Sequence, residues 1–164
     1  MQPAGAAGRR DGDGFVLDGE YRYVIDGHSA DLLVVAAREA GSAGGQGIAL
    51  FLLPADSPGV SRQWLPTMDQ ARKQARVQLD GVAVDSGAAL GTPGEGWPLL
   101  SRVLDLAAIA LAAEQVGGSQ RLLDMTVEYT AERVQFNRSI ASFQAVKHKA
   151  ADMMLQVEVA VAYE

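Results

Sequence analysis

Residues 129–153, YTAERVQFNRSIASFQAVKHKAADM, join two helical patterns through a short polar break. Before the break, apolar residues recur at three- and four-residue spacing, as at Leu122, Met125 and Tyr129, which is typical of a helix with one apolar face. The sequence therefore predicts a long helix, a loop and a second helix, over 98–135, 137–142 and from 143 past 161.

The residues before Trp97 have a different composition. Of 18 Gly residues 16 precede Trp97, and of six Pro residues only Pro98 follows it. Gly and Pro are tolerated in turns and unfavourable inside helices. We therefore expect an α+β class, with an antiparallel β-sandwich or barrel first and then long antiparallel helices.

About six strands are expected before residue 85. Phe15–Ile25 is a predicted hairpin, because Asp18-Gly19 supplies the positive φ angles of a tight turn between residues that favour strands. Further strands are predicted over 31–38, 48–53, 60–65 and 76–84, with a loop at 41–47 and turns at 56–59 and 80–81.

The predicted long helix contains Gly117-Gly118. The pair marks either a close contact with another helix or a break, and contact is the favoured interpretation. The second helix remains apolar on one face as far as the end of the sequence. We expect the helix pair to need partner helices, from another chain or from sequence outside this one.

Composition excludes several kinds of site. The sequence has no Cys and only two distant histidines, His28 and His148, so no metal site is expected. The formal net charge is −6 without a basic cluster, which disfavours nucleic acid. The most apolar run, 103–113, contains Asp105 and is shorter than the roughly 20 residues that span a bilayer. No signal segment is recognisable, so a cytoplasmic location is expected.

Three short motifs resemble functional sites but lack essential parts. Residues 27–31 (GHSAD) lack the closing Gly of a nucleophile elbow. Residues 41–47 (GSAGGQG) lead into a strand, whereas phosphate-binding glycine loops lead into a helix. Residues 11–14 (DGDG) lack the remaining ligands of a calcium loop and are predicted to form a solvated turn.

The stretch 129–153 resembles the acyl-CoA dehydrogenase signature, Y-x-x-x-R-x-Q-F-G-x-x-I-x-x-F-Q followed by a helix with L-A-D-M. Residues 11–20 resemble the D-G-x-G-x-x-L-N-G-x-K segment of this family, and 27–35 its N-G-x-x-A-D-x-x-x-V strand. Residues 91–97 (GTPGEGW) resemble L-G-x-x-x-G-F before the first C-terminal helix. The matches are collinear over about residues 11–160.

The resemblance implies a domain organisation and a reaction. Residues 1–92 would belong to the middle β-domain and 93–164 to the C-terminal helical domain, both partial, so that the long helices would be the first two of an incomplete four-helix bundle. The family reaction is α,β-desaturation of an acyl-CoA thioester: a carboxylate takes the α proton and hydride passes to N5 of FAD. Electrons then pass to electron-transfer flavoprotein, and subunits associate as homo- or hetero-oligomers through the C-terminal helices.

The resemblance also implies which residues bind FAD and substrate. Arg133 matches the arginine that reaches the FAD pyrophosphate of a neighbouring subunit, as bidentate guanidinium–phosphate pairing would favour. Phe143 and Gln144 match the pair at the adenine end, and Gln135 another FAD contact. Asp105 matches a residue of the acyl-CoA site. The alternatives are a solvated helix-end cation at Arg133, simple packing of Phe143 and a surface position for Asp105.

The sequence departs from the family pattern near the expected flavin ring. Tyr23-Val24-Ile25 replaces the W-I-T strand, so Ile25 lacks the hydroxyl with which Thr donates a hydrogen bond to the flavin. Ala107 and Ala108 occupy positions where members carry a base or an arginine beside it. No catalytic base is assigned within this chain, and it is expected outside.

Three interpretations follow. The chain is part of an FAD-dependent acyl-CoA dehydrogenase, a non-catalytic partner subunit of a heteromeric one that lends FAD contacts without a base, or a non-enzymatic interaction module. In each case we expect the chain alone to be inactive.

Overall fold

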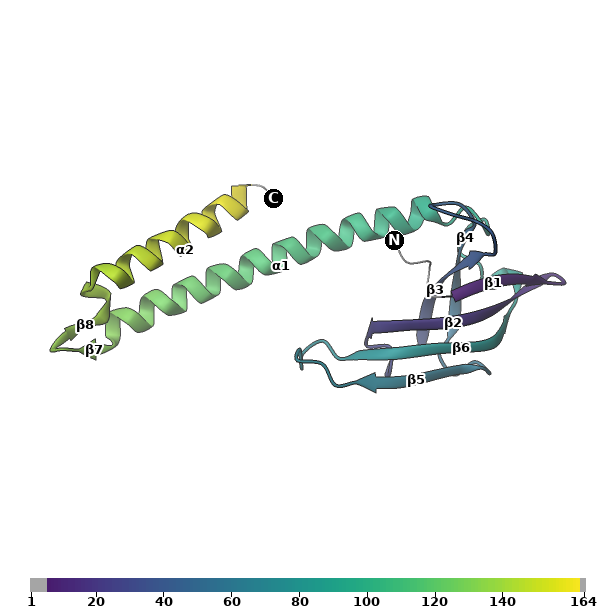
Figure 1. The fold of residues 1–164 in the computed structure, drawn as a ribbon, viewed down its shortest axis with the longest axis horizontal. Helices are drawn as coiled ribbons and strands as arrows, with labels where there is room; N and C mark the ends of the chain where they lie inside the picture. Colours follow the sequence, from purple (N-terminus) through teal and green to yellow (C-terminus); the bar gives the residue numbers. More distant parts are fainter. Residues whose placement is uncertain (1–5, 163–164) are drawn as a thin grey trace. The chain divides into compact units, whose positions relative to one another are not determined.

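The computed structural model describes residues 6–162. The chain forms two compact units, of which the first ends at Ser101 and the second begins at Arg102. The first unit holds the main sheet, and the second holds most of helix α1 and all of helix α2 (Figure 1).

The first unit is built on one six-stranded sheet in the order β4-β3-β1-β2-β6-β5. Four of its strand pairs are antiparallel, while β1 and β3 run parallel, so the sheet is mixed. The predicted α+β class is confirmed. The strands are β1 (Ala6–Asp11), β2 (Gly14–Ile25), β3 (Leu32–Glu39), β4 (Ile48–Pro54), β5 (Val60–Leu65) and β6 (Gln74–Val84).

The hairpin predicted within Phe15–Ile25 is wrong, because this stretch lies in the continuous strand β2. The hairpin joins β1 to β2 instead, with Asp11 paired to Gly14. Asp18 does not form a turn: its carboxylate accepts a hydrogen bond from the Gly81 amide at 2.7 Å. Residues 80–81, predicted as a turn, form a bulge inside β6 opposite Asp18.

The sheet curls so that its inner face encloses one apolar core. Phe15 of β2 and Phe51 of β4 are separated by two strands in the sheet order, yet their ring centroids lie 5.0 Å apart. The Tyr21 hydroxyl donates a hydrogen bond to the Ala36 carbonyl at 2.8 Å, and burial raises the pKa of Tyr21. The largest fully buried side chains are those of Phe51, Leu17, Leu53, Val77 and Val82.

The two edges of the sheet differ. The edge of β4 is covered by the segment that leads to α1: the Leu90 amide donates to the Leu50 carbonyl at 2.8 Å, and the Gly96 amide to the Ile48 carbonyl at 2.7 Å. At the opposite edge, β5 pairs only with β6 among the described residues, and residues 61–64 of this strand are exposed. Only one edge of the sheet is therefore covered.

Two long helices follow, as predicted. They are α1 (Trp97–Glu132) and α2 (Gln144–Ala162), separated by β7 (Val134–Gln135), β8 (Arg138–Ser139) and a 3-10 turn, η2 (Ile140–Ser142). Another 3-10 turn, η1 (Ser86–Ala88), follows β6. Helix α1 ends three residues earlier than expected, because 134–135 pair with 138–139 as a small ladder.

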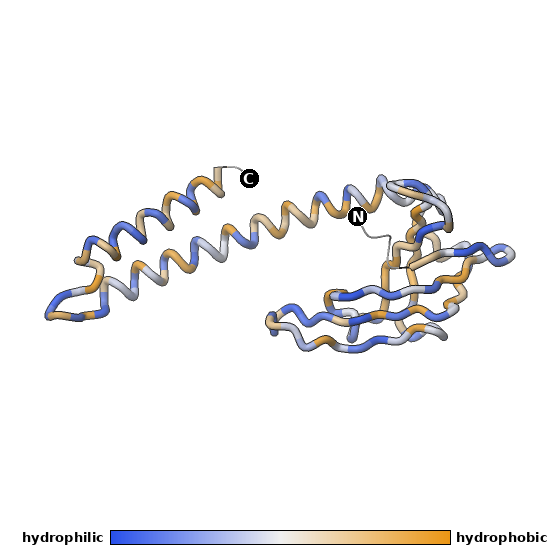
Figure 2. The backbone as a smooth tube through the Cα atoms, viewed as in Figure 1, coloured by the Kyte–Doolittle hydropathy of each residue, from blue (hydrophilic) through white to orange (hydrophobic). Residues whose placement is uncertain are grey.

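Helix α1 continues without interruption through Gly117-Gly118, so the pair is not a break. The favoured contact is not found either: a Cβ at Gly117 or Gly118 would meet no heavy atom within 4 Å among the described residues. Only Leu123 of α1 and Val157 of α2 are buried. Apolar residues recur along both helices (Figure 2), and most of their side chains are exposed in this structure.

Candidate functional site

Four candidate residues of the helical unit, Arg133, Gln135, Phe143 and Gln144, lie in or next to the short connection between α1 and α2 that contains the β7–β8 hairpin. Gln135 pairs with Arg138 across a two-residue turn, Phe136-Asn137. Both turn residues have positive φ, 53° and 60°, as a tight hairpin of this length requires. Asn tolerates this backbone well, whereas Phe136 adopts it at a steric cost and is 88% exposed. The hairpin thus projects an aromatic side chain into solvent.

Hydrogen bonds join the hairpin to the end of α1. The Ser139 hydroxyl donates to the Thr130 carbonyl of α1 at 2.8 Å and accepts a bond from the Ala141 amide at 3.3 Å. The Ile140 amide donates to the Arg133 carbonyl at 2.8 Å. The backbone between α1 and α2 is therefore an ordered connection anchored at the end of α1.

Phe143 lies between two other side chains of this connection. The Arg138 guanidinium carbon is 4.0 Å from the centre of the Phe143 ring, a cation–π contact. The Phe136 ring meets Phe143 edge-on, with centroids 6.1 Å apart. Sequence reasoning missed Arg138; the signal that could have found it is the two-residue turn, which places residue 138 opposite Gln135.

Arg133 and the two glutamines supply polar groups at the same place. The Arg133 side chain is exposed and has no hydrogen bond or ion pair with other described residues. Gln135 donates to the Val134 carbonyl at 2.8 Å, and Gln144 is the exposed first residue of α2. A guanidinium with five available donors suits the pyrophosphate of a dinucleotide such as FAD, and amide side chains of the same short connection could bind other polar groups of that ligand.

Tyr23, Val24 and Ile25 lie in the first unit, at the end of β2. Two residues of β2, 22 and 23, stand opposite one residue of β6, which makes a bulge, and Tyr23 has a φ of 62°. Val24 packs against the core, while Tyr23 and Ile25 are 63% and 59% exposed. The bulge thus directs the two neighbours of Val24 outward.

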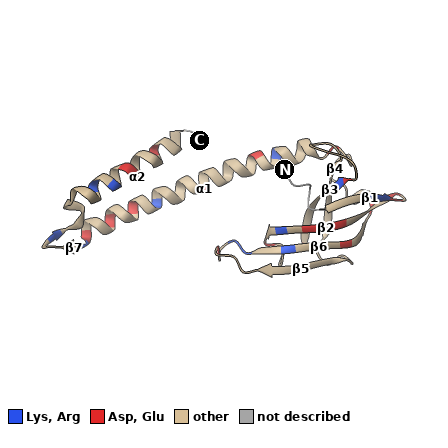
Figure 3. Ribbon diagram, in the orientation of Figure 1, with Lys and Arg blue, Asp and Glu red and all other residues tan. Residues whose placement is uncertain are grey.

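Asp105 lies on α1, and its side chain is exposed. No hydrogen bond or ion pair joins it to another residue of the described chain. This agrees with the surface position that the sequence left open. Near the end of α1, Asp124, Glu128 and Glu132 recur at four-residue spacing, and the start of α2 carries Lys147 and Lys149, as the red and blue segments of these helices show (Figure 3).

Comparisons with known proteins agree on one family. A profile of the acyl-CoA dehydrogenase C-terminal domain matches residues 94–163. The chain is 37% identical over 145 residues to acyl-CoA dehydrogenase IpdE2 of Mycobacterium tuberculosis, covering 88% of this chain and 37% of that protein. It is 31% identical over 152 residues to a probable acyl-CoA dehydrogenase, YngJ, of Bacillus subtilis, covering 91% of this chain and 40% of YngJ.

Solved structures resemble both units. A probable acyl-CoA dehydrogenase from Mycobacterium abscessus superposes with a TM-score of 0.90 at 26% identity, over 96% of this chain and 42% of that one. This chain spans about two fifths of the length of the curated relatives it matches. Within residues 6–162, no helix is long and apolar enough to cross a bilayer.

Proposed function

Because the chain belongs to the acyl-CoA dehydrogenase family, we propose that it serves the FAD-dependent α,β-desaturation of an acyl-CoA thioester, as part or subunit of such an enzyme. The observation that carries the proposal is the ordered connection between α1 and α2, which carries an exposed arginine, two glutamines and a phenylalanine within twelve residues, 133–144. On this proposal, residues 1–92 form the middle β-domain and 93–164 the helical domain.

Each candidate residue has a role in binding. Arg133 would pair with the pyrophosphate of FAD, and Gln135, Phe143 and Gln144 would contact its adenine half. The exposed Tyr23–Ile25 segment would border the isoalloxazine ring. When bound, FAD accepts the substrate hydrogen as hydride and passes electrons on, in this proposal to electron-transfer flavoprotein in the cytoplasm.

This chain would bind and orient without moving the substrate proton. Asp105 would contact the acyl-CoA from the surface of α1. Ala107 and Ala108 have no group that could act as a base. The residue that removes the α proton would then come from outside this chain.

The second candidate is a partner subunit of a heteromeric acyl-CoA dehydrogenase that lends FAD contacts only. Two features favour it: Ile25 has no hydroxyl to donate to the flavin, and Ala108 stands where an arginine is usual in the family. A non-enzymatic interaction module is the remaining alternative. Flavin binding distinguishes the two dehydrogenase interpretations, which require it, from a non-enzymatic module, which does not.

Titration of FAD into the purified chain, followed by flavin fluorescence, tests the proposal. We expect binding, and we expect Arg133→Gln to weaken it about tenfold or more, since a charged hydrogen bond contributes about 1.5–3 kcal/mol. The FAD affinity of Arg133→Lys should lie between those of the unchanged chain and Arg133→Gln, because lysine keeps the charge but lacks the planar guanidinium. Arg121→Gln, an exposed arginine on α1, is the matched control. Equal affinities of the Arg133→Gln and Arg121→Gln variants would contradict the assignment.

A further inference from the structure

Toward one end of the curled sheet, the residues on its inner face become small and then charged. Along β1 the inward positions are Ala6, Gly8 and Arg10, because Gly8 pairs with the buried Leu17 and Arg10 with Phe15. Along β3 the buried positions alternate up to Ala37, which places Glu39 next on the same face. Small residues and then charged ones therefore follow the large apolar core.

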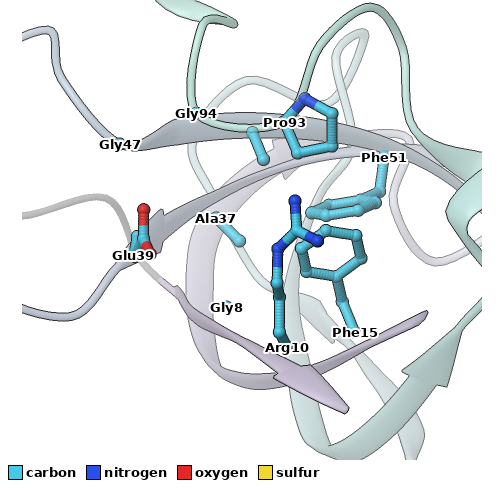
Figure 4. Close-up of a pocket in the computed structure, with 10 residues that line it drawn as sticks. Gly8, Arg10, Phe15, Ala37, Glu39, Gly47, Phe51, Pro93 and Gly94 are labelled. Atoms are coloured by element: carbon cyan, nitrogen blue, oxygen red, sulfur yellow. The ribbon is translucent and has the colours of Figure 1, made fainter. Parts of the chain in front are cut away.

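These small residues leave a cavity of about 130 Å³ within the first unit. Its walls and floor include Phe15, Phe51, Ala37 and Ala49 (Figure 4). The Phe15 and Phe51 rings are tilted by 57° to one another at the floor. A cavity of this size matches an apolar group of about six heavy atoms, since a cavity near 150 Å³ accepts benzene.

Arg10 and Glu39 both line the cavity (Figure 4). The Arg10 guanidinium carbon lies 5.3 Å from the centre of the Phe15 ring. Within residues 6–162, neither side chain makes a hydrogen bond or an ion pair. The cavity thus offers an unpaired cation, an unpaired anion and an aromatic floor.

We propose that this cavity binds a small apolar amino acid as its zwitterion. The carboxylate would meet Arg10, the ammonium group Glu39, and the side chain the Phe15 and Phe51 rings. Both charged side chains are exposed, so the discrimination is electrostatic: a simple carboxylic acid would meet Arg10 but be repelled by Glu39, and a simple amine would meet Glu39 but be repelled by Arg10. The proposal uses none of the residues assigned to FAD, so it stands or falls independently of the proposed function.

Three matched probes test the charge requirement in the full chain by calorimetry or NMR titration. They are L-leucine, 4-methylpentanoate, which lacks the ammonium group, and 3-methylbutylamine, which lacks the carboxylate. We expect leucine to bind and each analogue to bind at least tenfold more weakly. Absence of leucine binding up to about 10 mM, or equal binding of all three probes, would overturn the proposal.

Substitutions of Arg10 and Glu39 then test the two charged groups separately. Arg10→Gln should weaken the binding of leucine at least tenfold and leave the binding of 3-methylbutylamine unchanged. Glu39→Gln should also weaken the binding of leucine, but it should not weaken the binding of 4-methylpentanoate. Arg9→Gln is the control, because Arg9 is the neighbouring arginine of β1 and is exposed on the other face of the strand. Leucine affinity that responds equally to Arg10→Gln and Arg9→Gln would refute a site in this cavity.

Discussion

Individual charged side chains of the first unit have different partners. Glu20 of β2 accepts hydrogen bonds from Arg22, at 2.5 Å, and from Arg76 of the neighbouring strand, at 2.7 Å. The Arg22 hydrogen bond is the main cause that lowers the pKa of Glu20, and Arg76 adds to it. The Glu20 carboxylate, through Arg76, therefore joins β2 to β6 on the outer face of the sheet.

Stability should depend on the ionisation of Glu20. A carboxyl whose folded pKa is lowered stabilises the fold above its unfolded value, 4.5, and loses this contribution as the pH falls through the folded pKa. We expect Glu20→Gln to lower the urea midpoint slightly at pH 7, since exposed ion pairs contribute little. The difference from the unchanged chain should shrink below pH 4.5.

Glu95→Gln provides the control, because Glu95 is exposed and makes no side-chain ion pair in the described chain. A difference between the Glu20→Gln variant and the unchanged chain that stays constant from pH 7 to about pH 3 would contradict the role of the Glu20 carboxylate.

At the candidate site, the sequence was informative where residues are close in the chain. Arg133, Gln135, Phe143 and Gln144 share one short connection, so their grouping follows from the order of the helices. Whether they bind FAD stays a prediction. Arg138 was missed, because its contact with the Phe143 ring follows from the hairpin at Phe136-Asn137, which was predicted only as a loop.

Among the elements, the helices and most strands were predicted well, and the predicted turns at 11–14 and 56–59 are present, whereas those at 18–19 and 80–81 lie inside strands. Periodicity over many residues located α1 and α2. Asp18-Gly19 and Asp80-Gly81 have the local chemistry of turns, but the two pairs face each other across β2 and β6 at a bulge. Local propensity alone does not distinguish a bulge from a turn, since both use positive φ. The parallel β1–β3 pair depends on long-range pairing and was not predicted.

Gly117 offers a test at the level of a single helix. The residue is exposed within α1, and an added Cβ meets nothing within 4 Å. We expect Gly117→Ala to stabilise the helix by about 0.5–1 kcal/mol, because Gly is a poor helix former. Urea unfolding followed by far-UV circular dichroism measures this, with Ala113→Gly as the reverse control. A loss of stability in Gly117→Ala would instead indicate a close contact with another chain.

For the whole molecule, the two units have very different interiors. The first unit has a continuous core, whereas the helices bury only Leu123 and Val157 and expose much apolar surface. Exposed apolar surface of this extent marks an association surface. This fits the expectation that the helices need partner helices, from another chain or from sequence outside this one.

Catalysis should also need more than this chain. We expect the isolated chain, supplied with FAD and an acyl-CoA such as butyryl-CoA, to show no bleaching of the flavin absorbance. The reason is that no assigned residue can remove the α proton. FAD binding in the same sample is the control that separates a missing base from a missing cofactor. Substrate-dependent bleaching by the chain alone would show that a base lies within it.

The unequal edges of the sheet decide where unwanted association could start. A strand edge offers backbone amides and carbonyls that an extended peptide from another molecule can pair with. The segment before α1 blocks such growth beside β4, which leaves β5 as the available template. Ser61, Arg62 and Gln63 make that edge polar, and Pro66 stops its extension. Among the described residues, resistance to edge-to-edge pairing of this sheet therefore depends on the polar side chains of one short strand.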